Sequence, residues 1–585
     1  MKNMIMFLII LLAAQIKAGE IAVSGKQSST IEYQLEQIIE PFQGIDILMI
    51  SFVLPQDFSS PTYSQKITGL RFDFSDTPLR EENEIDLRGN HVRKFYWDRP
   101  RQPIQCSISL QAENSVQLSE LQSGAPFPAI EMTGQVQPFL ESTEQVQANE
   151  PSIQKKASEI TAGKTSQFAA VQAVLHYVVD HLRYVLVPEQ FDALYTLNSG
   201  RGNCQNFSHL SAALLRAAGI PVRIVNGITL KRAYDIPLKD VEYSLEMAQG
   251  RHSWIEVYFP DLGWLPFDPQ QTAYFISSRY LRIEVGLDNE ESVQDGLVRW
   301  TQSSGSPELM PRLEEAIESR FVADDYKFSG RKLAEGPRML LLSPPLKASG
   351  EPVISEAIPP KEEEPELPEK SETGPETAPE PPPEIKEEID YRKLKYDVPS
   401  EFGNLEFPQN VDFLYTSLMG SGGSKQGGEI RRNFLVETAE YVTGDRYFAQ
   451  VIPLDHPVIL QKVALAMHNF GGTGKIWLEL SEDNEGKPGQ TAARSTEVNT
   501  RLVPRRRGYD WVDFDFSKEG LLLTPGRYWI VLKYSGAPIV NAFYTYGKPV
   551  GPVDGTRSSA AAAGWNTILN YEFNYRVTGK KPDSY

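Results

Sequence analysis

A proline- and glutamate-rich stretch divides this chain of 585 residues into two parts. Between Pro344 and Asp390 the sequence holds 14 acidic and 4 basic residues and few apolar ones. Prolines stiffen such a segment and glutamates repel one another, while too little apolar surface is present to offset the entropy lost on ordering. We therefore expect residues 343–391 to be a disordered linker. The alternative, a proline-rich docking ligand, is rarer than a spacer.

The N-terminus has the pattern of a secretory signal. Lys2 precedes an apolar run from Met4 to Ala14, and a short polar stretch ends at Ala18. A run of about 11 apolar residues is too short to span a bilayer as a helix. We expect residues 1–18 to be removed as a signal peptide and the mature protein to be secreted or periplasmic. No stable membrane insertion is expected, since no later stretch approaches about 18 uninterrupted apolar residues.

Two cysteines, Cys106 and Cys204, are too few for a disulfide framework in an exported protein. Cys106 lies in the alternating stretch "PIQCSISLQ", where a cysteine is usually a small buried apolar residue. Seven scattered histidines form no ligand cluster at zinc spacing, so neither a metal nor a cofactor is expected. The net charge of −19 disfavours a nucleic-acid partner.

Strand-like runs occupy both ends of the chain. Residues 19–150 show short alternating segments broken by Pro, Gly and Asn, which predict an antiparallel β-sandwich. Residues 287–342 mix strand-like and helix-like pieces and remain unassigned. Strand patterns return over residues 392–585, where a second β-sandwich of jelly-roll type fits best. The chain is thus expected to be multidomain.

The region between residues 151 and 286 changes to a helical period. Apolar residues in "TSQFAAVQAVLHYVVDHLRYV" recur on one helical stripe, and Thr165 or Ser166 can cap this helix. After another helical stretch at 204–218, the runs "VRIVNGITL", "SWIEVYF" and "GWLPFDP" indicate strands. One helical layer followed by an antiparallel sheet predicts an α+β domain.

Cys204 is the candidate nucleophile. It lies in "SGRGNCQNFSHLSAALLRAAGIPVR", where an apolar stripe predicts a helix that begins at Cys204 and ends before Gly219 and Pro221. Free N–H groups and the dipole at a helix N-terminus favour a thiolate over a thiol and can also stabilise an oxyanion. The competing interpretation is an inert cysteine at a helix start, because a reactive cysteine needs a partner base.

His252 and Asp268 are the candidate partners of Cys204. His176 and His181 lie on an earlier helix, and His209 points to another face of the helix that Cys204 begins. His252 opens a strand, and Asp268 lies on the return strand of the same ribbon, so that a carboxylate can orient the imidazole. Pro266 and Pro269 are expected to prevent a regular ladder there. A lone histidine at a strand start is more often structural, and an aspartate before proline is usually a turn former.

Three motifs follow in order along this region. They are Gly-x-Gly-x-Cys leading into "LLRAAGIPVR", the strand His-x-Trp-x-Glu-Val from His252 to Val257, and "W-x-P-x-D-P" ending at Pro269. Together they resemble the bacterial transglutaminase-like superfamily, which has a papain-like thiol enzyme core. The resemblance spans residues 150–285 and implies a triad of Cys204, His252 and Asp268. Trp254 and Trp264 are candidates for packing around the site and for binding substrate.

Two positions depart from the family pattern. Gln205 follows the cysteine where animal cross-linking members have tryptophan, and Asn206 stands where bacterial relatives often have an acid. Because many bacterial relatives are taken to be peptidases or amidases, the resemblance implies hydrolysis of peptide or isopeptide bonds in a protein or peptide substrate. The alternatives are a protein-glutamine amine acyltransferase, which cross-links proteins, and a non-catalytic surface scaffold.

The C-terminal region resembles, more weakly, jelly-roll accessory modules of secreted bacterial proteins. Some of these modules bind carbohydrate, so a polymer or carbohydrate ligand is a candidate partner. Four tryptophans could stack on sugar rings, although an aromatic residue in a strand is more often part of the core: Trp477, Trp511, Trp529 and Trp565.

Overall fold

The structure is a computed structural model. It describes residues 19–129, 134–185, 188–230, 232–238, 242–246, 250–270, 273–303, 309–334, 340–348, 389–403, 418–424, 426–432, 439–444, 446–503, 505, 509–546, 556–560, 564–568 and 571–583. The expected signal peptide and most of the expected linker therefore lie outside the described residues. In the described part of the chain, no helix has the length and apolar character needed to cross a membrane.

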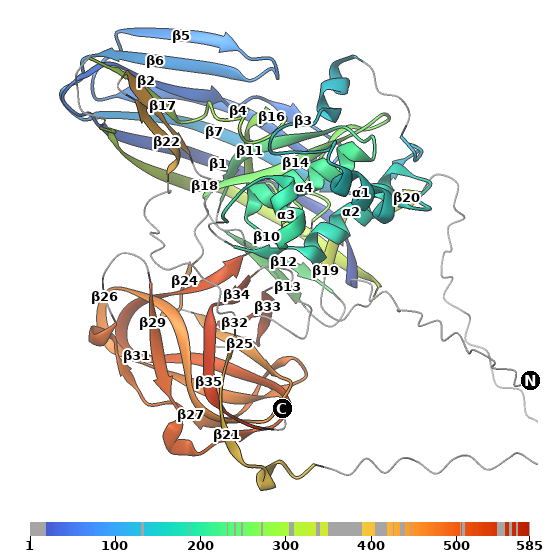
Figure 1. Ribbon diagram of the computed structural model, residues 1–585, viewed down its shortest axis with the longest axis vertical. Helices are drawn as coiled ribbons and strands as arrows, with labels where there is room; N and C mark the ends of the chain where they lie inside the picture. The colour runs from blue at the N-terminus through green and yellow to red at the C-terminus, as the bar shows by residue number, and fades with distance from the viewer. Residues whose placement is uncertain are drawn as a thin grey trace, which may run out of the picture.

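The N-terminal strands, drawn in blue at the top of Figure 1, build two sheets together with strands from later in the chain. The first has the order β18-β1-β7-β4-β3 with β19 beside β1, and its strands are β1 (Gly19–Glu40), β3 (Phe58–Ser59), β4 (Tyr63–Phe74), β7 (Ile104–Leu118), β18 (Arg312–Ala334) and β19 (Leu340–Ser343). The second has the order β22-β23-β17-β2-β6-β5, and its strands are β2 (Ile45–Leu54), β5 (Arg80–Ile85), β6 (His91–Asp98), β17 (Leu297–Gln302), β22 (Leu418–Ser424) and β23 (Gly427–Arg432).

The core of these two sheets follows from strand alternation. Along β7, Cys106 and Ile108 lie among the buried residues that also include Phe52 of β2 and Phe95 of β6. Cys106 is fully buried, as expected for a cysteine in an alternating apolar strand. Cys106 thus belongs to the packed core of the N-terminal sheets and lies far along the chain from Cys204.

Two segments join the N-terminal sheets unexpectedly: the sequence left one of them unassigned and assigned the other to the C-terminal module. β18 pairs with β1 along its length, from Glu20 opposite Ala334 to Glu40 opposite Arg312, so the unassigned residues 287–342 supply strands to these sheets. Residues 418–432, which the sequence assigned to the C-terminal module, instead form β22 and β23, and β23 pairs with β17. Ile430 is buried in the N-terminal core as a result.

The α+β region lies against these sheets. Its helices, in teal and green in Figure 1, are α1 (Pro151–Thr161), α2 (Gln167–His181), α3 (Ala193–Ser199) and α4 (Cys204–Ala217), preceded by the 3-10 helix η1 (Gly134–Leu140). The antiparallel sheet has the order β15-β14-β11-β16, with strands β11 (Val222–Thr229), β14 (Gly250–Phe259), β15 (Gly263–Phe267) and β16 (Tyr280–Gly286). Ser166 caps α2, because its side chain accepts from the N–H of Ala169 at 3.3 Å.

The C-terminal module is also rich in β-strands. Its strands are β21 (Tyr396–Gly403), β24 (Ala439–Tyr441), β25 (Arg446–Leu454), β26 (Val458–Asn484), β27 (Lys487–Arg494), β28 (Val498–Asn499), β29 (Asp510–Asp515), β30 (Leu522–Leu523), β31 (Gly526–Tyr546), β32 (Thr556–Ala560), β33 (Asn566–Ile568), β34 (Tyr571–Phe573) and β35 (Tyr575–Pro582). The long strands β26 and β31 pair from Met467 opposite Ala542 to Glu482 opposite Tyr528. The jelly-roll connectivity stays a prediction.

The C-terminal module contacts the α+β region. A hairpin of β12 (Ala233–Pro237) and β13 (Glu242–Glu246) leaves the α+β sheet between β11 and β14, and β13 pairs in parallel with β33 of the module. Figure 1 shows β12, β13 and β33 together at this junction. The linker therefore joins two parts that share a strand pairing, rather than two separate bodies.

Candidate active site

Cys204 is the first residue of α4, as the sequence predicts. The N-cap is Asn203, whose side-chain oxygen accepts from the N–H of Gln205 at 3.1 Å, and the side-chain oxygen of Asn206 accepts from the Asn203 N–H at 3.1 Å. These reciprocal bonds form a capping box. They fix the turn that carries the thiol at the positive end of the helix dipole.

Asn206 has a role that an acid could not fill. Its amide nitrogen donates to Thr196 Oγ1 at 2.7 Å and to the carbonyl of Gln190 at 3.0 Å. A carboxylate has no proton to donate to either acceptor. The asparagine that stands in place of the acid of the family pattern therefore makes two hydrogen bonds that the acid could not make.

Gly202 lies against the same amide. A Cβ added at Gly202 would come within 2.1 Å of the Asn206 Cβ and 2.7 Å of its Oδ1. The Asn206 side chain is held by three hydrogen bonds, so it cannot move away freely. The glycine of the Gly-x-Cys lead is thus needed for a close approach at the start of α4.

His252 and Asp268 form a buried pair. His252 Nε2 lies 2.7 Å from Asp268 Oδ2, and both side chains have an exposed fraction of 0%. Asp268 Oδ1 accepts from the N–H of Gln270 at 3.0 Å, which holds the carboxylate in the turn after β15. The structure therefore brings together the histidine and the aspartate that the sequence selects.

The ladder beside this pair is regular, contrary to the expectation from the prolines. β14 and β15 pair from Ile255 opposite Phe267 to Phe259 opposite Gly263, with Pro266 inside the ladder opposite Glu256. β15 is an edge strand of its sheet, so a missing N–H on its outer side removes no ladder bond.

The charge state of His252 follows from its neighbours. Burial by itself lowers the pKa of His252, but the carboxylate of Asp268 and the thiol of Cys204 outweigh it and raise the pKa to about 10. His252 is then an imidazolium at neutral pH. Because Nε2 is bound to Asp268, Nδ1 is the ring nitrogen left for Cys204. An imidazolium beside a cysteine at a helix N-terminus is the setting that favours a thiolate.

Tyr280 was missed by sequence reasoning. Its hydroxyl donates to Asp268 Oδ2 at 2.5 Å, the same oxygen that binds His252. Tyr280 begins β16, and the chain between it and Asp268 gives no local periodicity that would place the two side chains together. No signal in a single sequence would have found this contact.

Tyr184 was missed as well. The two-residue strands β9 (Arg183–Tyr184) and β10 (Arg201–Gly202) pair in parallel, which places Tyr184 beside Gly202 and close to the start of α4. Burial raises the pKa of Tyr184 well above its usual value, and Cys204 raises it further. The phenol is therefore neutral and adjacent to the candidate nucleophile.

Trp254 and Trp264 lie in different places. Trp254 has an exposed fraction of 0% and stacks on His252 with ring centroids 6.1 Å apart. Its ring passes over Gly227, where an added Cβ would lie 2.6 Å from Trp254 Cη2. Trp264 pairs with Tyr258, about 20 Å along the strand from His252. Trp254 thus supports the imidazole from within the core, and Trp264 is remote from the pair.

The remaining histidines of this region have structural contacts. His209 Nδ1 donates to the carbonyl of Phe191 at 2.7 Å, while its Nε2 accepts from the Asn289 N–H at 3.2 Å. His181 Nε2 lies 2.7 Å from the carbonyl of Leu197. Burial, with Lys164 nearby, lowers the pKa of His176 to about 4. None of these contacts involves Cys204.

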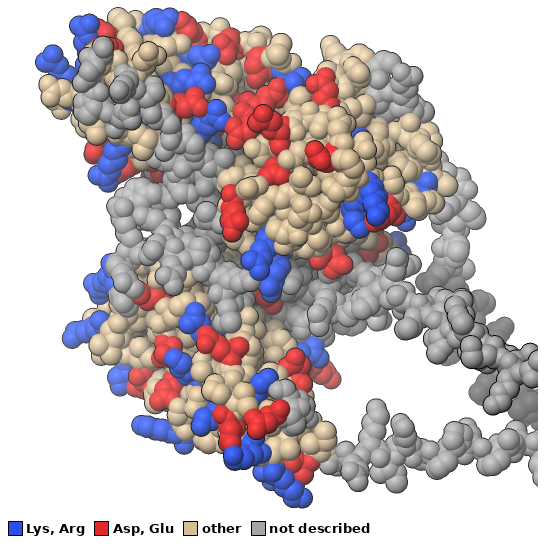
Figure 2. Space-filling view, viewed as in Figure 1, with Lys and Arg blue, Asp and Glu red and all other residues tan. Residues whose placement is uncertain are grey.

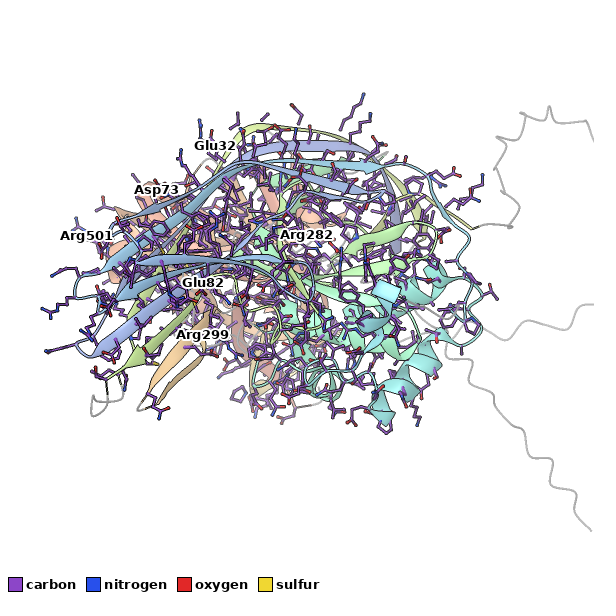
Figure 3. All side chains as sticks on the ribbon, turned by 90° about the horizontal axis from the view of Figure 1, so that it is seen from above. Glu32, Asp73, Glu82, Arg282, Arg299 and Arg501 are labelled. Atoms are coloured by element: carbon purple, nitrogen blue, oxygen red, sulfur yellow. The ribbon has the colours of Figure 1, made fainter. Side chains whose placement is uncertain are left out.

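The N-terminal sheets hold β16 in place. Tyr63 Oη and Asn114 Nδ2 each donate to the carbonyl of Tyr280 at 2.8 Å, from β4 and β7. Gln65 Nε2 donates to the carbonyl of Arg282 at 2.9 Å. Figure 3 shows Arg282 in the interior, where its guanidinium binds the buried Glu256 at 2.7 Å. The N-terminal domain is therefore part of the support for the site.

The four tryptophans of the C-terminal module do not together form one exposed surface. Trp529 has an exposed fraction of 0% and donates to Asp483 at 2.7 Å, which excludes it from stacking on a sugar. Arg494 covers the ring of Trp477 at 4.1 Å, and Arg576 covers that of Trp511 at 4.3 Å. The face of the molecule in Figure 2 carries acidic and basic side chains interspersed.

The geometry defines a class of site. A cysteine at a helix N-terminus beside an imidazole held by a buried carboxylate is an arrangement that can activate a thiol nucleophile. Cys204 has an exposed fraction of 2% and is therefore almost completely buried.

Comparison with known proteins agrees with this class. Residues 154–269 match the family model of the transglutaminase-like superfamily. The chain therefore contains a domain of this superfamily, and the resemblance seen in its motifs is confirmed.

Two curated relatives are similar to part of the chain. The uncharacterized protein YebA of Bacillus subtilis is 31% identical over 125 residues, which cover 20% of this chain and 17% of YebA. A protein-glutamine gamma-glutamyltransferase of Pseudomonas aeruginosa is 30% identical over 146 residues, which cover 24% of this chain and 20% of that protein. The chain thus aligns with about a fifth of the length of these relatives.

Solved structures resemble the chain only distantly. A protein of Cytophaga hutchinsonii proposed to be a cysteine protease has a TM-score of 0.35 at 16% identity, covering 54% of this chain and 95% of that one. The periplasmic domain of TgpA from Pseudomonas aeruginosa has a TM-score of 0.22 at 16% identity, covering 40% of this chain and 88% of that one. The family assignment accordingly rests on the sequence matches.

Proposed function

We propose that this chain is a cysteine amidase that cleaves peptide or isopeptide bonds through an acyl-enzyme on Cys204. The observation that carries the proposal is the buried contact of 2.7 Å between His252 and Asp268, which keeps an imidazolium ready beside the start of α4. His252 is the acid and base of the reaction, and Asp268 orients and charges it.

The reaction has two steps. The Cys204 thiolate attacks the carbonyl carbon of the amide, and the oxygen that becomes negative is stabilised by the N-terminal dipole of α4. The C–N bond then breaks, and the leaving nitrogen takes the proton from His252 Nδ1. In the second step, water attacks the thioester, its proton passes to His252, and the C–S bond breaks to release the acid and restore the thiolate.

Acyl transfer to an amine is the second candidate. It is favoured by one observation, the printed activity of the Pseudomonas aeruginosa relative, a protein-glutamine gamma-glutamyltransferase. The first step would be unchanged, and a primary amine instead of water would attack the thioester. Gln205 and not tryptophan follows Cys204, which supports hydrolysis over cross-linking.

Mass spectrometry of a peptide pool separates the two candidates. The protein is incubated with the pool, with and without a primary amine, next to a Cys204→Ala variant and a Cys106→Ala variant. Hydrolysis predicts cleaved peptides in both mixtures, whereas transfer predicts peptides that carry the amine and have lost ammonia. Cys106→Ala should behave as the parent protein, because this cysteine is buried in the N-terminal core. Products that persist in Cys204→Ala would refute the proposal.

The place of action is proposed to be outside the cytoplasm. The pattern from Lys2 to Ala18 supports export, and the two cysteines are far apart in the chain. Expression of the full chain in a bacterial host, followed by fractionation and N-terminal sequencing, should give a secreted or periplasmic protein that begins at Gly19. A protein retained in the cytoplasm with Met1 in place would contradict this.

A further inference from the structure

Among the described residues, two groups bind Asp268 Oδ2. His252 Nε2 lies 2.7 Å from it and the Tyr280 hydroxyl 2.5 Å, while the other oxygen of the carboxylate accepts the Gln270 N–H at 3.0 Å. An oxygen shared by two donors holds each less strongly than it would hold one alone, because its negative charge is divided. The phenol of Tyr280 therefore competes directly with the imidazolium for the charge of Asp268.

Packing and hydrogen bonds hold Tyr280 in one position. Its side chain is buried, and its ring stands edge-on to Trp254, with centroids 5.2 Å apart and an interplanar angle of 89°. Its carbonyl accepts bonds of 2.8 Å from both Tyr63 and Asn114. The backbone and the ring of Tyr280 are thus both held in place, so its hydroxyl has a defined direction.

A competing donor bears on both steps of the proposed reaction. His252 has to give its proton to the leaving nitrogen in the first step and accept one from water in the second. The more strongly the carboxylate holds the imidazolium, the weaker an acid His252 is. A second donor on the same oxygen weakens that hold and brings the acid closer to the working pH.

We infer that Tyr280 is a positioning residue that moderates the pull of Asp268 on the His252 proton through its hydroxyl. The inference rests on the proposed function for its catalytic meaning, but the hydrogen bond also acts on the resting protein. Titration of His252 can therefore reveal it without any substrate.

Other charged and titratable groups border the pair. Cys204 faces it from α4, and Tyr234 of β12 is close enough that Asp268, after the larger effect of burial, raises its pKa. Arg279, just before β16, binds Asp324 of β18 at 2.7 Å, so its charge is compensated. Among these groups, Tyr234 offers a matched control: a buried tyrosine that senses Asp268.

The test compares Tyr280→Phe with Tyr234→Phe in the full chain. The titration of the His252 ring, followed by NMR of the labelled histidine, and the pH dependence of kcat/KM on a fluorogenic amide are measured for both. Without the competing donor, Tyr280→Phe should move the basic limb of both profiles up by about one pH unit, the effect of losing one hydrogen bond to a charged group. It should lower kcat several-fold with little change in KM, and Tyr234→Phe should leave the limb in place.

A second replacement acts in the opposite direction. 3-Fluorotyrosine placed at position 280 is a more acidic phenol and a stronger donor, so the basic limb should move to lower pH. A merely structural role for the ring predicts no such pair of opposite shifts. An unchanged limb in Tyr280→Phe, or a limb that moves down, overturns the inference. If neither the parent nor any variant turns over amides, the proposed function fails while the titration of His252 still decides the role of Tyr280.

Discussion

Replacing Asp268 with Asn separates charge from geometry in the candidate site. An asparagine keeps a carbonyl oxygen that can accept from His252 and Tyr280, but it has no negative charge. The structure attributes the pKa of about 10 at His252 mainly to Asp268 acting against burial. With the charge removed, burial is left largely unopposed and the pKa of His252 should fall to its ordinary value of about 6.5 or lower.

The size of the effect follows from these values. A fall from about 10 to about 6.5 corresponds to about 5 kcal/mol, at about 1.4 kcal/mol for each pKa unit, which is an upper bound for so tightly coupled a pair. An imidazolium partner favours a thiolate, whereas an unassisted thiol with the ordinary pKa of about 8.5 is only about 1% ionised at pH 6.5. Thiolate reactivity at that pH should therefore fall by about 10²-fold in Asp268→Asn.

Iodoacetamide alkylation followed by mass spectrometry of the Cys204 peptide measures this reactivity from pH 5 to pH 10. The parent should react faster than Asp268→Asn at acidic and neutral pH, and the two rates should converge at the alkaline end. Circular dichroism checks that the variant is folded. A parent-like profile in folded Asp268→Asn would refute the assignment of Asp268 as the group that charges His252.

Four further outcomes are expected. His252→Ala should slow acylation by about 10²-fold or more, the usual effect of losing a general acid and base, measured by the burst of a fluorogenic amide. Gly202→Ala should destabilise the protein by about 1–3 kcal/mol and slow Cys204 alkylation, since its Cβ would displace Asn206; a parent-like melt would contradict this. Ile430→Asp should destabilise the N-terminal domain by about 3 kcal/mol, seen by hydrogen exchange in β17, because its side chain lies in that core. Finally, the raised pKa of His252 stabilises the fold fully below pH 6.5, and this stabilisation is lost as the pH rises through about 10. The melting temperature of the parent should therefore exceed that of Asp268→Asn at neutral pH. The two melting temperatures should approach each other above pH 10.

Local signals were enough to place the candidate nucleophile at a helix start. The apolar stripe after Cys204 and the glycine before it predict the start of α4, and the structure places the helix start at that residue. The ribbon from His252 to Asp268 also followed from the sequence, because one short turn connects its two strands. The prediction about Pro266 was wrong because a sequence does not show which strand lies at a sheet edge.

Contacts between distant segments could not be predicted. β18 is rich in charged residues because it is an edge strand with an exposed face, so its period resembles that of a surface helix as much as that of a strand. β23 follows the linker in sequence but pairs with β17 before it, a connection that no local pattern records. Tyr280 reaches Asp268 for the same reason, since the pairing of β11 with β16 decides where β16 begins.

The family match therefore leaves out residues that contact the candidate site. The match ends at residue 269, directly after Asp268, and so includes the sulfur, the imidazole and the carboxylate. It leaves out Tyr280, which divides the charge of that carboxylate, and the side chains of Tyr63 and Asn114, which fix the Tyr280 backbone from the N-terminal sheets. A segment limited to the match would keep the reacting groups and lose the bonds that set their proton affinity. The N-terminal domain thus supports the candidate active site, because the bonds that position Tyr280 begin on its strands.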